Sequence, residues 1–541
     1  MAIRNSKWHI RLPIIVSLTL VCGIFIGAVM SGKNEKGNVM GNYLKYLEIL
    51  NLIEKDYVDT VNTDELVEYS INKMFEKLDP HTTYIPKREL DLAKSQLEGS
   101  FEGIGIEFNI IKDTIYVVTP ISGGPSEQVG LQAGDKIIKV NGENVAGTNI
   151  TTMEVFKKLR GKKGTEVRVS IMRKGVKNLL EYKIIRDKIP TYSVDASYMI
   201  DKETGYIKVS KFSENTYIEF KQALRKLLDK GMTQLILDLK DNPGGYMQPA
   251  IEMADEFISG DKMIVYTDGK GTKYDEKYRA GNKGEFEKNP LIVLINEGSA
   301  SASEIVSGAL QDNDRALIVG RRSFGKGLVG RQIPLSDQSE IRLTISRYYT
   351  PSGRCIQKPY EKNDLDKYHF DLANRYQKGE FFHADSIKFA DSLKYKTSKG
   401  RTVYGGGGIM PDYFVPRDTS ELTEYLFSLF NNNVIREYTI NFYTSNKNLY
   451  KDVPFDKFNA TFEVSDQMLS ELVALAEKSG VKYKESEFNK SKNYLKTNIK
   501  AYIARSFYGN EGFYQIINQT DEIYIAALKQ FSKARQLLKM K

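Results

Sequence analysis

The chain has 541 residues, of which 41 % are hydrophobic and 27 % charged, a balance typical of a globular protein with several domains. It excludes low-complexity and wholly disordered proteins. With 4 His and 2 Cys, the chain has few ligands for zinc sites, iron–sulfur clusters or disulfide frameworks. The net charge of +9 is spread without a long basic run, which favours a solvated lysine-rich surface over nucleic-acid binding.

The amino-terminal segment is apolar. Residues 12–30 carry no charge, and a helix needs about 20 residues to cross a bilayer. Arg4, Lys7 and Arg11 precede this run, so we expect the amino terminus in the cytoplasm and the rest of the chain outside it. A cleaved signal peptide is the alternative, but residues 27–32 offer a poor cleavage site. We therefore predict a single transmembrane helix, within a stub, anchor and linker over residues 1–41.

The next segment, residues 42–96, has two helical patterns. Apolar residues recur at helical spacing over 44–57 and again over 67–78. Asn62 and Glu65 form a capping-box pattern before the second run, and Pro80 follows it. We predict a small helical module here.

From Phe101 the pattern changes to short alternating strands separated by glycine turns. Two helical stretches, 125–129 and 152–159, interrupt them. The pattern predicts a small β-rich, barrel-like module over residues 97–188.

The section from residue 189 to 416 alternates strands with helices, which predicts an α/β layered core. Apolar strand runs cover 205–212, 233–239, 290–296 and 316–320, and helical patterns cover 217–228, 247–257 and 301–310. Residues 356–400 are charged and aromatic and are interpreted as an insertion outside the core. Four glycines then lead into a short strand, and residues 417–541 form a mostly helical, lysine-rich region.

Three loops follow the apolar strand runs directly, at 240–245, 297–301 and 321–327. Open α/β sheets place their sites at such strand ends. The first loop has paired glycines, the second has serines that begin a helix, and the third has a lysine between glycines. A serine, a lysine that burial makes a base, and backbone N–H groups form a minimal set for acyl transfer.

Simpler interpretations remain for each loop taken alone. Ser301 and Glu304 form a capping-box pattern, Gly244 and Gly245 suit an ordinary turn, and Lys326 suits an exposed loop. His81 is the only histidine near a recognisable motif, so a Ser–His–Asp triad is the less economical alternative.

Seven segments together resemble the carboxyl-terminal processing peptidases, or tail-specific proteases, which are PDZ-containing serine peptidases with a Ser–Lys dyad. In chain order they read LDPHTTYI, FEGIGIEF, PSEQVGLQAGDKIIKVNGENV, LILDLKDNPGG, NEGSASASEI, VGRRSFGKG and GGGGIMPDYFV. The resemblance implies a ClpP/crotonase-like α/β core over 189–416, with an inserted PDZ domain over 97–188. Helical amino- and carboxyl-terminal regions flank the two.

The resemblance also implies the dyad. The nucleophile falls on Ser301, and the general base falls on Lys326, with the family's spacing. The oxyanion hole falls on the backbone N–H groups of Ala302 and Gly244, with Gly245 as the near alternative.

One position departs from the family. The glutamine that commonly follows the lysine by four residues is replaced by Gly330, and Gln332 lies two residues further on. Because alternate residues share one face of a strand, Gln332 could serve as the third member through a bulge.

In the PDZ domain, the resemblance places the carboxylate-binding loop at Gly103, Ile104, Gly105 and Ile106. We expect Ile106, Val155 and Phe156 to face a groove that takes an apolar tail as an added strand.

The function that the resemblance implies is a membrane-anchored serine endopeptidase that recognises free carboxyl tails of exported proteins and cleaves through an acyl-enzyme. It implies the bacterial inner membrane, with the catalytic part on the periplasmic side, and protein or peptide substrates. No metal, organic cofactor or nucleic acid is expected, and a homo-oligomer is left open. The alternatives are a catalytically impaired PDZ adaptor that binds protein carboxyl ends and, against the anchor and the Ser–Lys spacing, a crotonase-type acyl-thioester enzyme.

Overall fold

The computed structural model describes residues 16–19, 21, 23, 38–95, 97–361 and 364–539. They fall into two compact units, Met1–Lys73 and Met74–Lys541. Most of the predicted membrane segment, residues 12–30, lies outside the described residues. Among the residues that are described, no helix has the length and apolar character needed to cross a bilayer.

The first unit contains the two predicted amino-terminal helices. They are α2 (Val39–Asp56) and α3 (Thr63–Phe75), the second of which runs just past the boundary between the units. Asn62 caps α3, because its side-chain oxygen accepts hydrogen bonds from the backbone of Asp64 and Glu65 at 3.1 and 3.4 Å.

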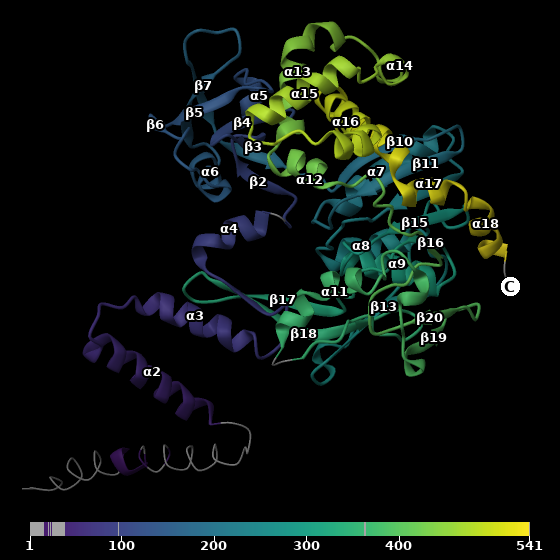
Figure 1. The fold of residues 1–541 in the computed structure, drawn as a ribbon. Helices are drawn as coiled ribbons and strands as arrows, with labels where there is room; N and C mark the ends of the chain where they lie inside the picture. Colours follow the sequence, from purple (N-terminus) through teal and green to yellow (C-terminus); the bar gives the residue numbers. More distant parts are fainter. Residues whose placement is uncertain are drawn as a thin grey trace, which may run out of the picture. The chain divides into compact units, whose positions relative to one another are not determined.

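A six-stranded sheet forms the centre of the second unit (Figure 1). Its strand order is β10-β11-β12-β15-β16-β21, with β10 antiparallel to β11 and the other neighbours parallel. The four predicted strand runs are confirmed in it. The strands are β10 (Val194–Met199), β11 (Thr204–Val209), β12 (Gln234–Asp238), β15 (Leu291–Ile295), β16 (Leu317–Gly320) and β21 (Tyr413–Phe414).

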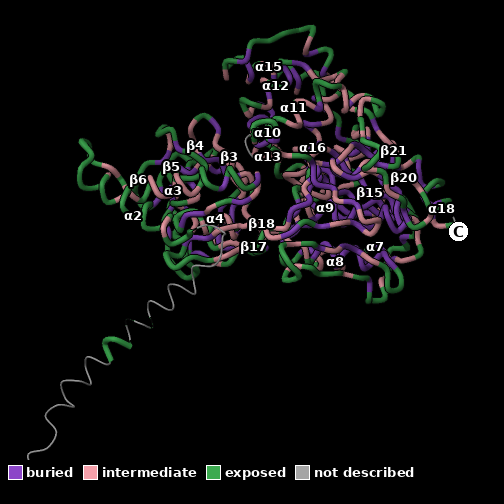
Figure 2. The backbone as a smooth tube through the Cα atoms, turned by 90° about the horizontal axis from the view of Figure 1, so that it is seen from below, coloured by how far each residue is buried: buried purple, intermediate pink, exposed green. Residues whose placement is uncertain are grey.

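Helices cover both faces of this sheet. One face, including Leu235 and Val293, packs against the predicted helices α7 (Thr216–Asp229), α8 (Met247–Asp255) and α9 (Ala302–Asp312). The other face, including Ile236 and Leu294, packs against α17 (Glu522–Leu528) and α18 (Phe531–Lys539). Figure 2 shows the buried residues gathered around β15 and α9. The last helices of the carboxyl-terminal region 417–541 are therefore part of the core, although the sequence patterns place them in a separate helical region.

A second sheet, which the sequence patterns do not predict, lies beside the three loops that follow β12, β15 and β16. Its order is β1-β18-β13-β14, and β17 pairs with β18 through a register shift between Val329 and Gly330. Helix α4 (Lys87–Ser95) follows its first strand. The strands are β1 (Thr83–Ile85), β13 (Met263–Gly269), β14 (Lys277–Arg279), β17 (Leu328–Pro334) and β18 (Glu340–Tyr349).

The β-rich module has its own core around Ile115, Ile137 and Val167. Its helices α5 (Pro125–Gln128) and α6 (Thr152–Leu159) lie where the sequence predicts them, and β2 (Ser100–Gly103) pairs with β9 (Asp187–Pro190). The sheet consists of β3 (Ile106–Ile111), β4 (Thr114–Pro120), β5 (Lys136–Val140), β6 (Glu143–Asn144), β7 (Glu166–Met172) and β8 (Leu180–Ile185).

Five further helices form a separate apolar cluster, and two of them contact the β-rich module. Arg505 of α16 pairs with Glu107 of β3 at 3.0 Å, and Glu437 of α13 pairs with Lys112 at 3.0 Å. The helices are α12 (Glu424–Asn431), α13 (Val434–Tyr450), α14 (Phe455–Thr461), α15 (Asp466–Lys478) and α16 (Glu485–Ile517).

The interpretation of residues 356–400 as an insertion outside the core needs correction. Ile356 is part of the main apolar cluster, and the buried Arg375 donates to the carbonyl groups of Arg322 and Ser323 at 2.8 and 3.0 Å. This segment therefore packs against the third loop and fixes its backbone. It contains α10 (Leu365–His369), α11 (Asp371–Gln377) and a hairpin of β19 (Lys394–Lys396) with β20 (Thr402–Tyr404).

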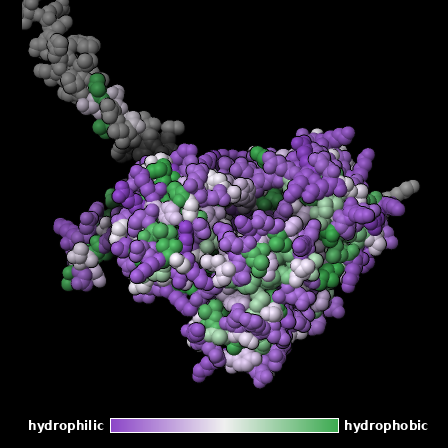
Figure 3. All heavy atoms as spheres, turned by 90° about the horizontal axis from the view of Figure 1, so that it is seen from above, coloured by the Kyte–Doolittle hydropathy of each residue, from purple (hydrophilic) through white to green (hydrophobic). Residues whose placement is uncertain are grey.

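On the face drawn in Figure 3, hydrophilic side chains predominate and apolar side chains form scattered patches. This distribution agrees with the solvated surface that the composition predicts.

Candidate active site

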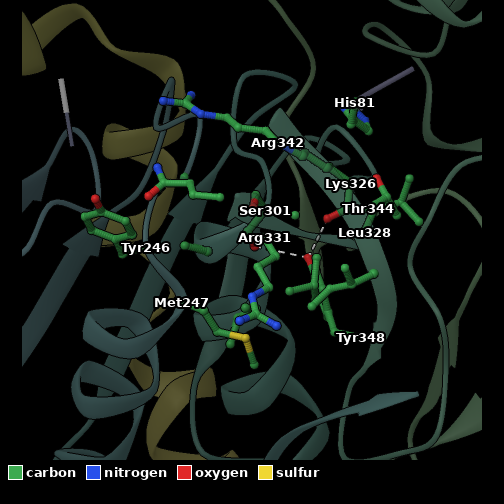
Figure 4. A pocket seen from close by; sticks show the side chains of 18 of the residues that line it. His81, Tyr246, Met247, Ser301, Lys326, Leu328, Arg331, Arg342, Thr344 and Tyr348 are labelled. Atoms are coloured by element: carbon green, nitrogen blue, oxygen red, sulfur yellow. Dashed lines mark hydrogen bonds between the residues drawn. The ribbon is translucent and has the colours of Figure 1, made fainter. Parts of the chain in front are cut away.

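The three predicted loops meet at one cavity of about 680 Å³ (Figure 4). It lies at the carboxyl ends of β12, β15 and β16, with β17 and β18 as its other wall. The loops contribute Pro243, Gly244, Gly245, Ser301, Ala302 and Lys326. The structure thus brings together the serine, the lysine and the glycines that are far apart in sequence.

Ser301 is held in a strained backbone conformation at the start of α9. Its φ of 55° and ψ of −113° lie where non-glycine residues are rare. Such a conformation costs on the order of 1–3 kcal/mol and is found mainly where the surrounding structure imposes it. The Ala302 N–H, in the first turn of α9, has no acceptor among the described residues, whereas the N–H groups of Ser301, Ser303 and Glu304 each have one.

Glu304, one turn into α9, connects the serine turn to the lysine turn. Its fully buried carboxylate accepts hydrogen bonds from the backbone N–H groups of Ser301, Gly325 and Lys326 at 2.8, 2.7 and 2.9 Å. The Ser323 hydroxyl donates a fourth at 2.5 Å. Burial raises the pKa of Glu304 to about 7, although these hydrogen bonds oppose the rise.

From the sequence, Glu304 is recognisable only as part of a helix cap. The capping pattern was the available signal, but it gave no sign that the same carboxylate also binds a turn more than twenty residues further along.

Lys326, from the third loop, also lines the cavity and is largely buried. Burial lowers the pKa of its ammonium group, the Arg342 charge lowers it further, and the Glu304 carboxylate opposes both. The Tyr348 hydroxyl donates to the carbonyl groups of Lys326 and Ser301 at 2.7 and 3.1 Å (Figure 4). In the part of the chain that the structure describes, no hydrogen bond engages the Lys326 side chain, which leaves it directed to the cavity.

The glycine loop presses against Ser301. A Cβ at Gly244, whose φ is +97°, would lie 2.7 Å from the Ser301 Cβ and 2.8 Å from the Ala300 carbonyl oxygen, so only glycine fits. The Gly244 N–H, however, already donates to the Asn242 side chain at 2.9 Å. Among the described residues, the N–H groups of Gly245 and Ala302 have no protein acceptor. Gly245 is therefore a better candidate than Gly244 for the second N–H donor of an oxyanion hole.

Gln332 lines the cavity but does not reach the lysine. It lines the same cavity as Tyr246, and its amide counters part of the rise that burial causes in the pKa of the Tyr246 hydroxyl. Within the described ranges, no hydrogen bond joins Gln332 to Lys326. The bulge that the sequence analysis considered is present beside Gly330, where a Cβ would meet no atom within 4 Å.

His81, which the sequence analysis considered only as a triad member, also lines the cavity. Its Nε2 hydrogen-bonds the Tyr368 hydroxyl at 2.7 Å. Burial and the nearby Lys326 charge lower the pKa of His81 to about 4, so the ring is neutral at pH 7. Asp79 fixes the preceding turn by accepting from the backbone of His81 and Thr82 at 2.8 and 2.9 Å.

The predicted carboxylate-binding loop runs from Gly103, which ends β2, to Ile106, which begins β3. Gly105 has a φ of +71°, and a Cβ there would lie 2.9 Å from Ile189. The Ser126 backbone and hydroxyl both donate to the Ile104 carbonyl, at 3.0 and 2.5 Å, and so fix the loop.

The three residues expected to face the groove differ in their placement. Ile106 and Val155 are buried in the module's core, so little of either side chain is exposed, and their place in the groove stays a prediction. Phe156 is partly exposed and packs edge-on against Phe108, with 5.7 Å between ring centroids.

A layered α/β core with a serine at the start of a helix, joined to a PDZ module, defines a PDZ-containing serine peptidase. Residues 203–366 match Peptidase family S41, residues 103–184 match the PDZ domain, and residues 425–509 match a family of unknown function. The chain therefore belongs to Peptidase family S41, as a carboxy-terminal processing serine protease.

The match to individual relatives extends over most of each relative's length. The chain is 36 % identical over 347 residues to the carboxy-terminal-processing protease of Bartonella bacilliformis, covering 62 % of this chain and 79 % of that protein. It is 35 % identical over 390 residues to carboxy-terminal processing protease CtpA of Bacillus subtilis, covering 69 % and 82 %. The solved photosystem II D1 C-terminal processing protease is 29 % identical, with 58 % and 90 % covered and a TM-score of 0.33.

Replacement of Glu304 by Gln tests its role in joining the two turns. The amide would place N–H donors against backbone N–H groups, so we expect the free energy of unfolding to fall by about 1–3 kcal/mol. We also expect kcat to fall by up to about 100-fold, because the serine and lysine turns lose their common anchor. Peptide-cleavage kinetics and thermal unfolding measure the two effects.

Glu487→Gln is the matched control. Glu487 accepts a hydrogen bond from the Tyr425 backbone at 2.7 Å within the carboxyl-terminal helices, away from the cavity. An undiminished kcat in Glu304→Gln, or an equal loss in both variants, would contradict the assigned role.

Proposed function

We propose that Ser301 is the nucleophile and Lys326 the general base of an endopeptidase that acts on proteins held by their free carboxyl ends. The observation that carries this proposal is the joint fixation of both residues' main chains by Glu304 and Tyr348 on one cavity. This arrangement holds a strained serine opposite a desolvated lysine, which is what Ser–Lys catalysis requires.

The chemistry proceeds through an acyl-enzyme. Neutral Lys326 accepts the hydroxyl proton as the Ser301 Oγ attacks the peptide carbonyl carbon. The resulting oxyanion accepts hydrogen bonds from the N–H groups of Gly245 and Ala302. Collapse breaks the C–N bond, and the Lys326 ammonium donates its proton to the departing amine. Lys326 then deprotonates water, which attacks the ester and releases the new carboxyl end with Ser301 restored.

The PDZ module supplies substrate selection in this proposal. Strand β3 is the edge strand of its sheet, so a peptide tail can pair along it with its carboxylate at the Gly103–Ile106 loop. Phe156 and Phe108 beside this edge favour an apolar terminal residue.

Cleavage of a protein with an apolar tail distinguishes the peptidase from a PDZ adaptor. We expect wild-type enzyme to cleave it and Ser301→Ala to bind it with at least about 10³-fold lower cleavage, because only the nucleophile is lost. Amidation of the tail should weaken binding to both forms. Mass spectrometry of products and titration of tail binding provide the readouts, and binding without cleavage by the wild type would favour the adaptor.

The pH profile tests Lys326 as the base. Because only neutral lysine accepts a proton, kcat/KM should rise with pH through the lowered pKa of Lys326 and level off below the ordinary lysine value of about 10.4. Lys326→Arg, which stays charged, should be inactive throughout. Burial raises the pKa of Glu304 to about 7 and lowers that of His81 to about 4, so the Lys326 rise is the one that should persist in both Glu304→Gln and His81→Gln. Unchanged activity in Lys326→Ala would contradict the assignment.

We also propose that residues 12–30 anchor the enzyme in the bacterial inner membrane, with the catalytic part outside the cytoplasm. The charge-free run and the preceding Arg4, Lys7 and Arg11 support this location. We expect the full chain to stay in the membrane pellet after alkaline carbonate extraction, whereas a variant without residues 1–31 should be released. A mature chain that begins near residue 32 would instead show a cleaved signal peptide.

A further inference from the structure

A charged residue lies at or near the start of each loop that contributes to the active-site cavity. Lys240 begins the glycine loop, Glu297 begins the serine loop, and Arg321 begins the lysine loop. The side chains of Lys240 and Arg321 are only 8 % and 7 % exposed. Buried charges of this kind require partners, which identifies the groups that hold the loops.

The partners come from the amino end of α17, more than two hundred residues further along the chain. Asp521 pairs with Lys240, and Glu522 pairs with Arg321 at 2.9 Å. Arg321 also pairs with Glu297 at 2.9 Å. Asp521 and Glu522 therefore contact the first and third loops directly, and they contact the second loop through Arg321.

These ion pairs stand beside a second cavity, of about 440 Å³, on the side of the loops that faces α16 and α17. Lys240, Glu297, Arg321, Asp521 and Glu522 all line it. Lys240 also lies 3.4 Å from Asp238, which ends β12, so the charged groups at the loop bases form an ion-pair network along this cavity.

The loops transmit this constraint to the site through short hydrogen bonds. Asp241, next to Lys240, exchanges two hydrogen bonds with the Asn296 side chain at 2.8 Å each. The Ala300 N–H donates to the Asn242 carbonyl, and the Phe324 N–H donates to the Ser299 carbonyl, both at 3.0 Å. A shift at the loop bases therefore reaches Gly245, Ser301 and Lys326 together.

We propose that Asp521 and Glu522 are positioning residues that hold the three active-site loops in register from behind. The proposal rests on the proposed function of Ser301 and assigns a task to a carboxyl-terminal helix. Helix α17 already packs on the sheet through the buried Ile523, Tyr524 and Ala527. Its acidic end can lose its charge while this packing stays.

The double variant Asp521→Asn/Glu522→Gln removes the charges and little else. Asp521 caps α17 by accepting from the Tyr524 N–H at 2.8 Å, and asparagine caps a helix equally well. We expect kcat to fall at least tenfold with KM changed less than twofold, and the rate of Ser301 phosphonylation by a fluorophosphonate, which releases fluoride, to fall in parallel. The conservative Asp521→Glu variant should restore at least half of the kcat lost in Asp521→Asn.

Asp466→Asn is the matched control, since Asp466 pairs with Lys492 at 2.9 Å within the carboxyl-terminal helices. It should keep wild-type kcat. The proposal is overturned if the double variant keeps wild-type kcat, or if its loss is matched by the control, or if KM rises as much as kcat falls. The single variants, with smaller expected losses, decide the matter if the double variant fails to fold. Absence of Ser301-dependent cleavage in the wild type would refute the proposed function instead.

Discussion

The buried carboxylate of Glu304 is the constraint on which the site depends. It gathers three backbone N–H groups and one hydroxyl from two turns that are distant in sequence. Each of these donors would be costly to bury without an acceptor. One side chain thereby satisfies the start of α9 and the lysine turn at once, and the relative placement of Ser301 and Lys326 follows from it. The strain at Ser301 is tolerable because this network determines its backbone.

The core sheet places a second constraint on the protease core, because it needs partners on both of its faces. Its strands are apolar on both faces, so both faces must be covered. Helices α7 to α9 cover one face and carry the serine at a helix start, while α17 and α18 cover the other. The carboxyl-terminal residues therefore complete the protease core. The same helical region also reaches the PDZ module, through the ion pair of Arg505 with Glu107.

The parts that sequence patterns predict are those whose cause is local. The runs around Leu235, Val293 and Ile318 are buried on both sides, which makes them continuous apolar strands that are easy to recognise. Strand β18 is only partly buried and carries charged residues, so its pattern is weak. Glu304 gave a capping signal that was correct but incomplete. The roles of His81, Tyr348 and Asp521 depend on contacts with distant segments, which no local pattern contains.

Burial at the site acts on two groups in opposite directions. It lowers the pKa of Lys326 and raises the pKa of Glu304 to about 7. A fully ionised Glu304 stabilises the Lys326 ammonium and so works against the neutral form that accepts a proton. At the higher pH that favours a neutral lysine, Glu304 is ionised, so its charge limits how far burial lowers the pKa of Lys326. Glu304 therefore holds the lysine turn through its backbone hydrogen bonds, while its charge keeps the pKa of Lys326 higher than burial alone would set it.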